Sequence, residues 1–131
     1  MNERINISSG APWEEIVGYS RAVRVGNLVE VAGTTAVDDD GQLVGKGDPY
    51  TQARFIFAKI EKSLTAAGAR MQDVVRTRMF VTDMSQWEEI GKAHGEVFAK
   101  IRPVATLVEV KSLISPGLLV EIEATAVLGP V

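Results

Sequence analysis

The sequence has 131 residues, a length that fits a single domain. Hydrophobic residues make up 46% and charged residues 24% of the chain, the usual balance of a globular protein in water. The net charge is −3 and no run of lysine or arginine occurs. Nucleic acid is therefore not expected as a partner, because binding to phosphates needs a concentrated basic face. The chain has no cysteine, which excludes disulfides, thiolate metal sites and cysteine nucleophiles.

Signals for export and for membrane insertion are not evident in the sequence. No apolar run approaches the roughly 20 residues of a membrane span. The start of the chain, Met1-Asn2-Glu3-Arg4, does not lead from a basic region into an apolar stretch, so no signal peptide is expected. We therefore expect a cytoplasmic protein with no membrane partner, folded as one domain over residues 1–131.

The first third of the chain predicts strands and turns. Residues 1–18 are mixed and rich in turn formers. Ala22–Val25 and Leu28–Ala32 are β-rich runs around the turn dipeptide Gly26-Asn27, which predicts a hairpin. Asp38-Asp39-Asp40-Gly41 predicts a second turn. The alternative for that segment, a cation loop, lacks the spacing and the downstream glutamate of an EF-hand.

The rest of the chain alternates between helical and strand patterns. Apolar residues over 49–68 recur at three- and four-residue steps, which predicts an amphipathic helix that stops at Gly68. The elements expected after it are a strand over 74–81, a helix over about 85–100 capped by Asp83 or Ser85, and strands over 104–110 and 118–128.

The predicted order ββ(β)αβαββ indicates an α+β fold, in which the helices cover one face of a five- or six-stranded sheet. Both of the last two strands carry apolar residues on either side of the chain. The uncovered face is therefore expected to be an apolar patch of roughly several hundred Å² or more, larger than monomers usually expose. Self-association is the consequence.

Two stretches in the last third of the chain match the order and spacing of a known family. They are Arg102-Pro103-Val104-Ala105-Thr106-Leu107-Val108-Glu109-Val110 and Leu118-Leu119-Val120-Glu121-Ile122-Glu123-Ala124. Further matching segments are Gly18-Tyr19-Ser20, Val25–Val29 with Ala32-Gly33, Ala66–Ala69, and Asp73–Thr77 with Phe80–Asp83. In these residues the chain resembles the Rid (YjgF-type) family of reactive intermediate deaminases.

The resemblance implies a chorismate-mutase-like fold: a sheet with two helices on one face that assembles as a barrel-like homotrimer. It also implies a pocket for a small-molecule ligand at each subunit interface. No cofactor is expected. Family members use water to attack a reactive enamine or imine, which releases ammonia and leaves a keto acid. An arginine holds the substrate carboxylate in a two-pronged grip that guanidinium supplies well.

Carried over residue by residue, the family's site is only partly retained. The arginine position, two residues after Pro103, is Ala105, so the chain resembles an arginine-lacking branch. The water-positioning glutamate is Glu121, the tyrosine is Tyr19, and the backbone contact lies at Gly33. An asparagine used by many members aligns near Gly91, and Leu107 is bulkier than the residue often found there.

Each candidate residue also has a structural interpretation. Glu121 either faces the pocket or is a strand carboxylate paired with a cation, and it shares a strand face with Glu123. Tyr19 is either a pocket lid or an interface aromatic, and Gly33 either a catalytic backbone contact or a point of close chain approach. The single histidine, His94, either binds substrate as an acid or base or is structural.

Two arginines could restore the missing charge. Arg78 lies in the middle of a strand, where it either pairs with Glu121 or Glu123 or binds an anionic ligand. Arg102, directly before Pro103, is expected at the surface. No phosphate loop is present, and His94 and Glu96 face different sides of their helix, so no metal site is expected.

The sequence thus favours a trimeric Rid-like hydrolase or deaminase that acts on C–N bonds without the usual carboxylate clamp. The alternative is a non-catalytic, small-metabolite binding or regulatory trimer. A ribonuclease is disfavoured by the acidic net charge.

Overall fold

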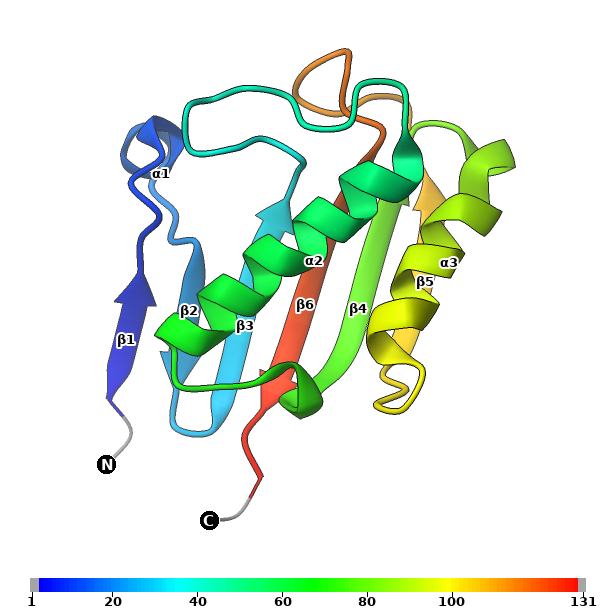
Figure 1. Cartoon of the computed structure of the whole chain (residues 1–131). Helices are drawn as coiled ribbons and strands as arrows, with labels where there is room; N and C mark the ends of the chain where they lie inside the picture. Colours follow the sequence, from blue (N-terminus) through cyan, green and yellow to red (C-terminus); the bar gives the residue numbers. More distant parts are fainter. Residues whose placement is uncertain (1–2, 130–131) are drawn as a thin grey trace.

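The computed structural model describes residues 3–129, which form one six-stranded sheet with helices packed on it (Figure 1). Across the sheet the strand order is β1-β2-β3-β6-β4-β5. The strands are β1 (Arg4–Ile7), β2 (Ala22–Val25), β3 (Leu28–Thr34), β4 (Val74–Val81), β5 (Val104–Glu109) and β6 (Val120–Val127). Only β4 and β5 run parallel; the other neighbours are antiparallel. The predicted α+β class is confirmed.

Helices α2 (Pro49–Ala66) and α3 (Trp87–Phe98) lie side by side across the same face of the sheet (Figure 1). A short helix, α1 (Pro12–Val17), stands beyond the end of β1, and two 3₁₀ turns, Met71–Asp73 and Met84–Gln86, precede β4 and α3. The helices α2 and α3 leave the second face of the sheet without a helical cover, and we call it the open face.

Local sequence explains where the elements begin and end. The Asp48 carboxylate accepts a hydrogen bond from the Thr51 amide at 3.1 Å, and Pro49 starts α2 where a missing N–H costs nothing. After α2, Gly68 adopts a φ of 84° that turns the chain toward β4. In the β2–β3 hairpin Gly26 has a φ of 60°, as the first residue of a tight hairpin turn requires.

The core lies between the sheet and the two long helices. It is built from side chains of α2, α3 and the inward positions of the central strands, among them Ile56, Ile60, Leu64, Ile90, Val29, Val81, Val120 and Ile122. Within residues 3–129 no helix combines the length and apolarity needed to cross a membrane.

The open face is less apolar than the sequence predicted. In β6, strict alternation places Val120, Ile122 and Ala124 under the helices, while Glu121 and Glu123 face the opposite side. The expectation of a continuous apolar patch is therefore wrong for the centre of this face, which also carries Arg76 and Arg78 of β4. Exposed apolar side chains remain at its margins: Val25, Leu28, Val127, Val104 and Val108.

The start of the chain is more ordered than the sequence indicated. Residues 4–7 form the edge strand β1, paired with β2, and residues 12–17 form α1. These elements are too short to show a hydrophobic period, and their order comes from pairing and capping. Glu14 is buried and accepts hydrogen bonds from both the amide and the hydroxyl of Ser9.

Candidate functional site

Glu121 and Gly33 meet at the end of the sheet. Val120 and Ile122 are fully buried under the helices, so the side chain of Glu121 between them lies on the open face. The pairing of β3 with β6 becomes irregular between Val31 and Thr34, and Gly33 lies in that bulge. A Cβ atom at Gly33 would overlap Oε2 of Glu121. The glycine therefore provides the space in which the carboxylate sits.

Arg21, directly before β2, lies at the same end of the sheet as Gly33 and Glu121. Ala22 is buried under the helices, so Arg21, one residue earlier, points to the open face, and its backbone carbonyl accepts from the Ala32 amide. The Arg21 Nη2 atom donates to the Gly33 carbonyl at 2.6 Å. Arg21 was not singled out by the sequence, although strand alternation next to Gly18-Tyr19-Ser20 could have placed it.

Tyr19 completes the group. The Cζ atom of Arg21 stands 5.9 Å from the centre of the Tyr19 ring, within the range of a cation–π contact. Arg21 therefore links Tyr19 to Gly33, and Gly33 in turn lies against Glu121. We call Tyr19, Arg21, Gly33 and Glu121 the Gly33 cluster.

The environment of Glu121 favours its protonated form. Burial of its carboxyl raises the pKa of Glu121, and the neighbouring charge of Glu123 raises it further, while Arg21 acts in the opposite direction. Arg78 does not neutralise it, because the Arg78 guanidinium pairs with Glu123 at 3.7 Å. Of the two partners open to Arg78, the structure thus selects Glu123.

A second group of expected site residues lies on the opposite face of the sheet. In the parallel register Ala105 is opposite Thr77, and Leu107 is opposite Met79. Because Thr77 is buried and contacts α3, Ala105 and Leu107 also point to the helix side of the edge strand β5. One copy of the chain therefore does not bring them together with the Gly33 cluster.

His94 is held on the helix side near this second group. Its Nε2 atom and the Thr77 hydroxyl share a hydrogen bond of 2.8 Å. The ring of Phe98 lies 4.7 Å and that of Phe57 5.7 Å from the imidazole, centre to centre. Burial lowers the pKa of His94 below its ordinary value of 6.5. Within a single copy the histidine tethers α3 to β4.

The free energy of unfolding should fall as the pH decreases from about 6.5 toward the native pKa of His94, and this contribution should be constant below it. The reason is that the unfolded chain binds more protons than the native chain in this window. Urea unfolding of the wild type and of His94→Gln at several pH values measures the effect as a difference. Ionisation of Glu121 changes the free energy of unfolding with pH in the opposite direction. Both proteins carry Glu121, so its contribution cancels in the difference. Parallel stability curves for the two would contradict the expectation.

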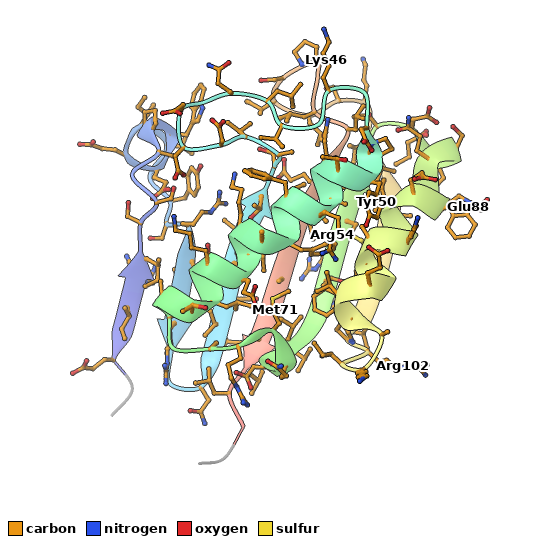
Figure 2. All side chains as sticks on the ribbon, in the orientation of Figure 1. Lys46, Tyr50, Arg54, Met71, Glu88 and Arg102 are labelled. Carbon is orange, nitrogen blue, oxygen red and sulfur yellow. The ribbon has the colours of Figure 1, made fainter. Side chains whose placement is uncertain are left out.

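Arg102 lies at the surface beyond the end of α3, as expected (Figure 2). Its Nε atom donates to the Ala99 carbonyl at 3.2 Å. Gly91, near which the resemblance aligned the family's asparagine, is exposed on α3. The Asp38–Gly41 segment is a turn, in which the Asp38 carboxylate accepts from the amides of Asp40 and Gln42.

A hollow of about 800 Å³ lies on the open face beside the Gly33 cluster. Tyr19 and Ser20 lie at the α1 side, and Glu30, Arg78 and Glu123 belong to its floor. Among the expected site residues, Tyr19 and Arg78 line this hollow, and Glu121 and Gly33 lie outside its lining. Within residues 3–129 no group of three or more metal-binding side chains is found.

Comparison with known proteins agrees with this architecture. Residues 10–128 match the family described as Endoribonuclease L-PSP. The crystal structure of Rv2704 of Mycobacterium tuberculosis, described as a member of the YjgF/YER057c/UK114 family, is 52% identical with a TM-score of 0.87. It covers 96% of this chain and 100% of that chain. An uncharacterized protein of Streptomyces coelicolor is 40% identical over 125 residues, which are 95% of this chain and 92% of the relative.

An enzyme also occurs among the relatives. The 3-aminoacrylate deaminase RutC of Acinetobacter baylyi is 29% identical over 126 residues, which are 96% of this chain and 98% of that protein. The fold is thus that of a mixed α+β sheet protein with two long helices on one face. The chain belongs to the YjgF/Rid family.

Proposed function

We propose that this protein is a small-molecule hydrolase of the deaminase type, which acts on the C–N bond of an enamine or imine in a pocket between subunits. The observation that supports the proposal most is the seating of the Glu121 carboxyl against Gly33, where burial raises its pKa. RutC, whose name states a deaminase activity, supports the reaction class.

The proposed chemistry needs one group that can hold both water and a proton. Water adds to the carbon of the C=N bond, the C–N bond then breaks, and the nitrogen leaves as ammonia while the carbon becomes a carbonyl. A carboxyl with a raised pKa can donate a proton to the departing nitrogen and accept one from the attacking water. Glu121 is the group we assign to this role.

The positions of the site residues on the two faces of the sheet support a pocket between subunits. The Gly33 cluster lies on the open face, and Ala105 and Leu107 lie on the helix side of the edge strand β5. A homotrimer in which β5 of one copy reaches the Gly33 cluster of the next would join both groups in one site. The exposed Val104 and Val108 of β5 supply apolar area for such a contact.

The reaction of 2-aminoacrylate tests the effect of Ala105. Losing a charged two-pronged contact costs about 2–5 kcal/mol where the partner charge is buried, which is about 30- to several-thousand-fold in rate. We expect ammonia release from 2-aminoacrylate to be slower by this factor than in a family member with the arginine. Equal rates in a coupled assay would show that another residue replaces the lost contact.

Restoring the arginine alone should recover little of that activity. Leu107 packs against the core beside position 105, so we expect Ala105→Arg to need the smaller side chain of Leu107→Cys as well. The Leu107→Cys single variant is the control, because loss of buried volume costs about 1–3 kcal/mol of stability. Full activity in Ala105→Arg alone would show that the rest of the pocket was already competent.

The alternative is a non-catalytic trimer that binds a small metabolite, and Ala105 is the residue that favours it. An inactive binder could have Glu121 fully engaged by Arg78, but Arg78 pairs with Glu123. This ion pair favours the enzyme. Ligand binding without ammonia release from any enamine or imine tested would favour the binder. A nuclease activity is not proposed, since the net charge is −3.

A further inference from the structure

The connection between β3 and α2, residues 35–48, begins two residues after Gly33 and passes along the end of the sheet (Figure 1). Its first part folds back on itself, because Val37 forms an antiparallel bridge with Leu43. Gly33 lies directly against the Glu121 carboxyl, where a Cβ atom would overlap Oε2. The conformation of the first residues of this connection therefore affects how closely the bulge of β3 covers that carboxyl.

Lys59 of α2 holds the start of this connection from the helix side. Its ammonium group donates to the carbonyls of Thr35 and Val37, both at 2.8 Å. The Nη2 atom of Arg21 donates to the Gly33 carbonyl at 2.6 Å. Two cations thus hold the carbonyls of alternate residues along 33–37, and Lys59 is the one that ties this backbone to a long helix.

The charges around Lys59 have both signs. Burial first and Arg21 second lower the pKa of Lys59, while Asp39 and Asp38 act in the opposite direction. Within residues 3–129 no ion pair within 4.0 Å joins Lys59 to either aspartate. The Asp38 carboxylate instead accepts from the amides of its own turn. The close partners of Lys59 are backbone carbonyls, as expected of a side chain that fixes the position of a segment.

The strand that carries Glu121 is tied to α2 by a different side chain. The Gln52 Oε1 atom accepts from the Leu119 amide at 2.9 Å, two residues before Glu121, and the Nε2 atom donates to the Gly117 carbonyl at 3.0 Å. Removal of the Lys59 ammonium should therefore release the β3 side of the contact between Gly33 and Glu121 and leave the β6 side in place.

We propose that Lys59 is a positioning residue of the site: by holding the Thr35 and Val37 carbonyls it keeps the bulge at Gly33 against the Glu121 carboxyl. Lys59 acts through the backbone of β3 and its connection, so its effect on the reaction is indirect. The assignment rests on the proposed function, in which Glu121 transfers the proton, and adds to it a residue of α2.

The test measures the pKa of Glu121 in the full chain by carbon-13 NMR, with Glu121→Gln to assign the signal. In Lys59→Met the backbone loses its two hydrogen bonds to α2, so the Glu121 carboxyl should gain contact with water. Because burial is the main cause of its raised pKa, the pKa of Glu121 should fall toward 4.5. Loss of a positive charge by itself would raise this pKa, so a fall identifies positioning. Glu123 and Arg21, the other charges that act on Glu121, are unchanged.

Two controls separate the ammonium from the rest of the side chain. Lys62→Met makes the same change at an exposed position three residues later on α2 and should leave the pKa of Glu121 unchanged. The chain has no cysteine, so Lys59→Cys offers a single site for alkylation in urea before refolding. An S-aminoethyl group, which rebuilds a lysine-like side chain, should restore the wild-type pKa of Glu121, and an S-propyl group of the same length should not.

The proposal is overturned if the pKa of Glu121 in Lys59→Met is unchanged or raised, or if the two alkylated forms of Lys59→Cys share one pKa of Glu121. Should Lys59→Met not fold, Lys59→Gln carries the test, since its shorter side chain keeps a donor but does not reach both carbonyls. The pKa of Glu121 should then fall in the same direction, and an unchanged pKa would overturn the proposal.

The NMR measurement needs no turnover, so this proposal and the proposed function fail separately. If the enzyme is active, Lys59→Met should slow ammonia release from 2-aminoacrylate by about tenfold or more, because a catalytic group is displaced. A fall in the pKa of Glu121 that aminoethylation reverses, with no ammonia released by the wild type, keeps the assignment of Lys59 and removes the enzyme. Ammonia release that is equally fast in Lys59→Met, together with an unchanged pKa of Glu121, removes the assignment and leaves the enzyme.

Discussion

Glu121→Gln should abolish turnover, and any binding that depends on the Glu121 carboxyl, while the fold and the assembly stay intact. The amide keeps the shape of the side chain but can neither hold nor release the proton that the reaction requires. Because burial and Glu123 disfavour the charged carboxylate, removing it should leave the stability at neutral pH unchanged or higher. Ammonia release, urea unfolding and sedimentation together measure these outcomes.

Glu123→Gln is the matched control for this change. It lies two residues away on the same face of β6 and loses the ion pair with Arg78, an exposed contact worth about 1 kcal/mol or less. We expect Glu123→Gln to lose far less turnover than Glu121→Gln, because burial, the main cause of the raised pKa of Glu121, remains. If Glu121→Gln instead unfolds or dissociates while Glu123→Gln does not, Glu121 is a structural residue and its assignment to the site is wrong.

Gly33→Ala should reduce turnover by about 100-fold, the size of effect expected when a catalytic group is displaced by about 1 Å. The new methyl group would occupy the space of Glu121 Oε2, so the carboxylate has to move. The atom in the way is the far end of a flexible side chain, and the φ of Gly33 is not positive, so the protein should still fold. Turnover and thermal unfolding of the variant check both statements.

A double-mutant cycle shows whether Gly33→Ala acts through Glu121. In a Glu121→Gln background the alanine should cause no further loss of ligand affinity, because the displaced group no longer contributes. Gly95→Ala is the control: nothing lies within 4 Å of its new Cβ, and in exposed helix it should stabilise the protein by about 0.5–1 kcal/mol. Additive losses in the cycle would contradict the mechanism.

The sequence predicted most elements of the fold because their patterns are long and regular. The strand predicted at 74–81 coincides with β4, and the helices predicted at 49–68 and 85–100 contain α2 and α3. The prediction for the open face was wrong because the apolar residues of the strands 104–110 and 118–128 were not each assigned to one face of the sheet. The alternation along β6 directs Val120, Ile122 and Ala124 to the helices and leaves Glu121 and Glu123 on the open face.

The candidate site was predictable only in part. The family motifs named Tyr19, Gly33 and Glu121, and the structure links these residues through contacts with Arg21 and between Gly33 and Glu121. Arg21 escaped notice because no motif marks it, and its importance comes from a bulge in β3 that pattern does not reveal. Ala105 points to the helix side of the sheet, away from the Gly33 cluster, because of the parallel register of β5 with β4. This register is also set by the tertiary structure and is not visible in the sequence pattern.

The central proposal is a site completed by a second copy of the chain, and subunit mixing tests it most directly. Glu121→Gln removes the Gly33-cluster half, and Ala105→Trp fills the β5 half. Each variant alone should lack turnover. In a co-expressed mixture of equal parts, about a quarter of the interfaces of a closed ring join two intact halves. Ammonia release restored to about that fraction of the wild-type rate is the predicted result. A mixture as inactive as its components would contradict the intersubunit site.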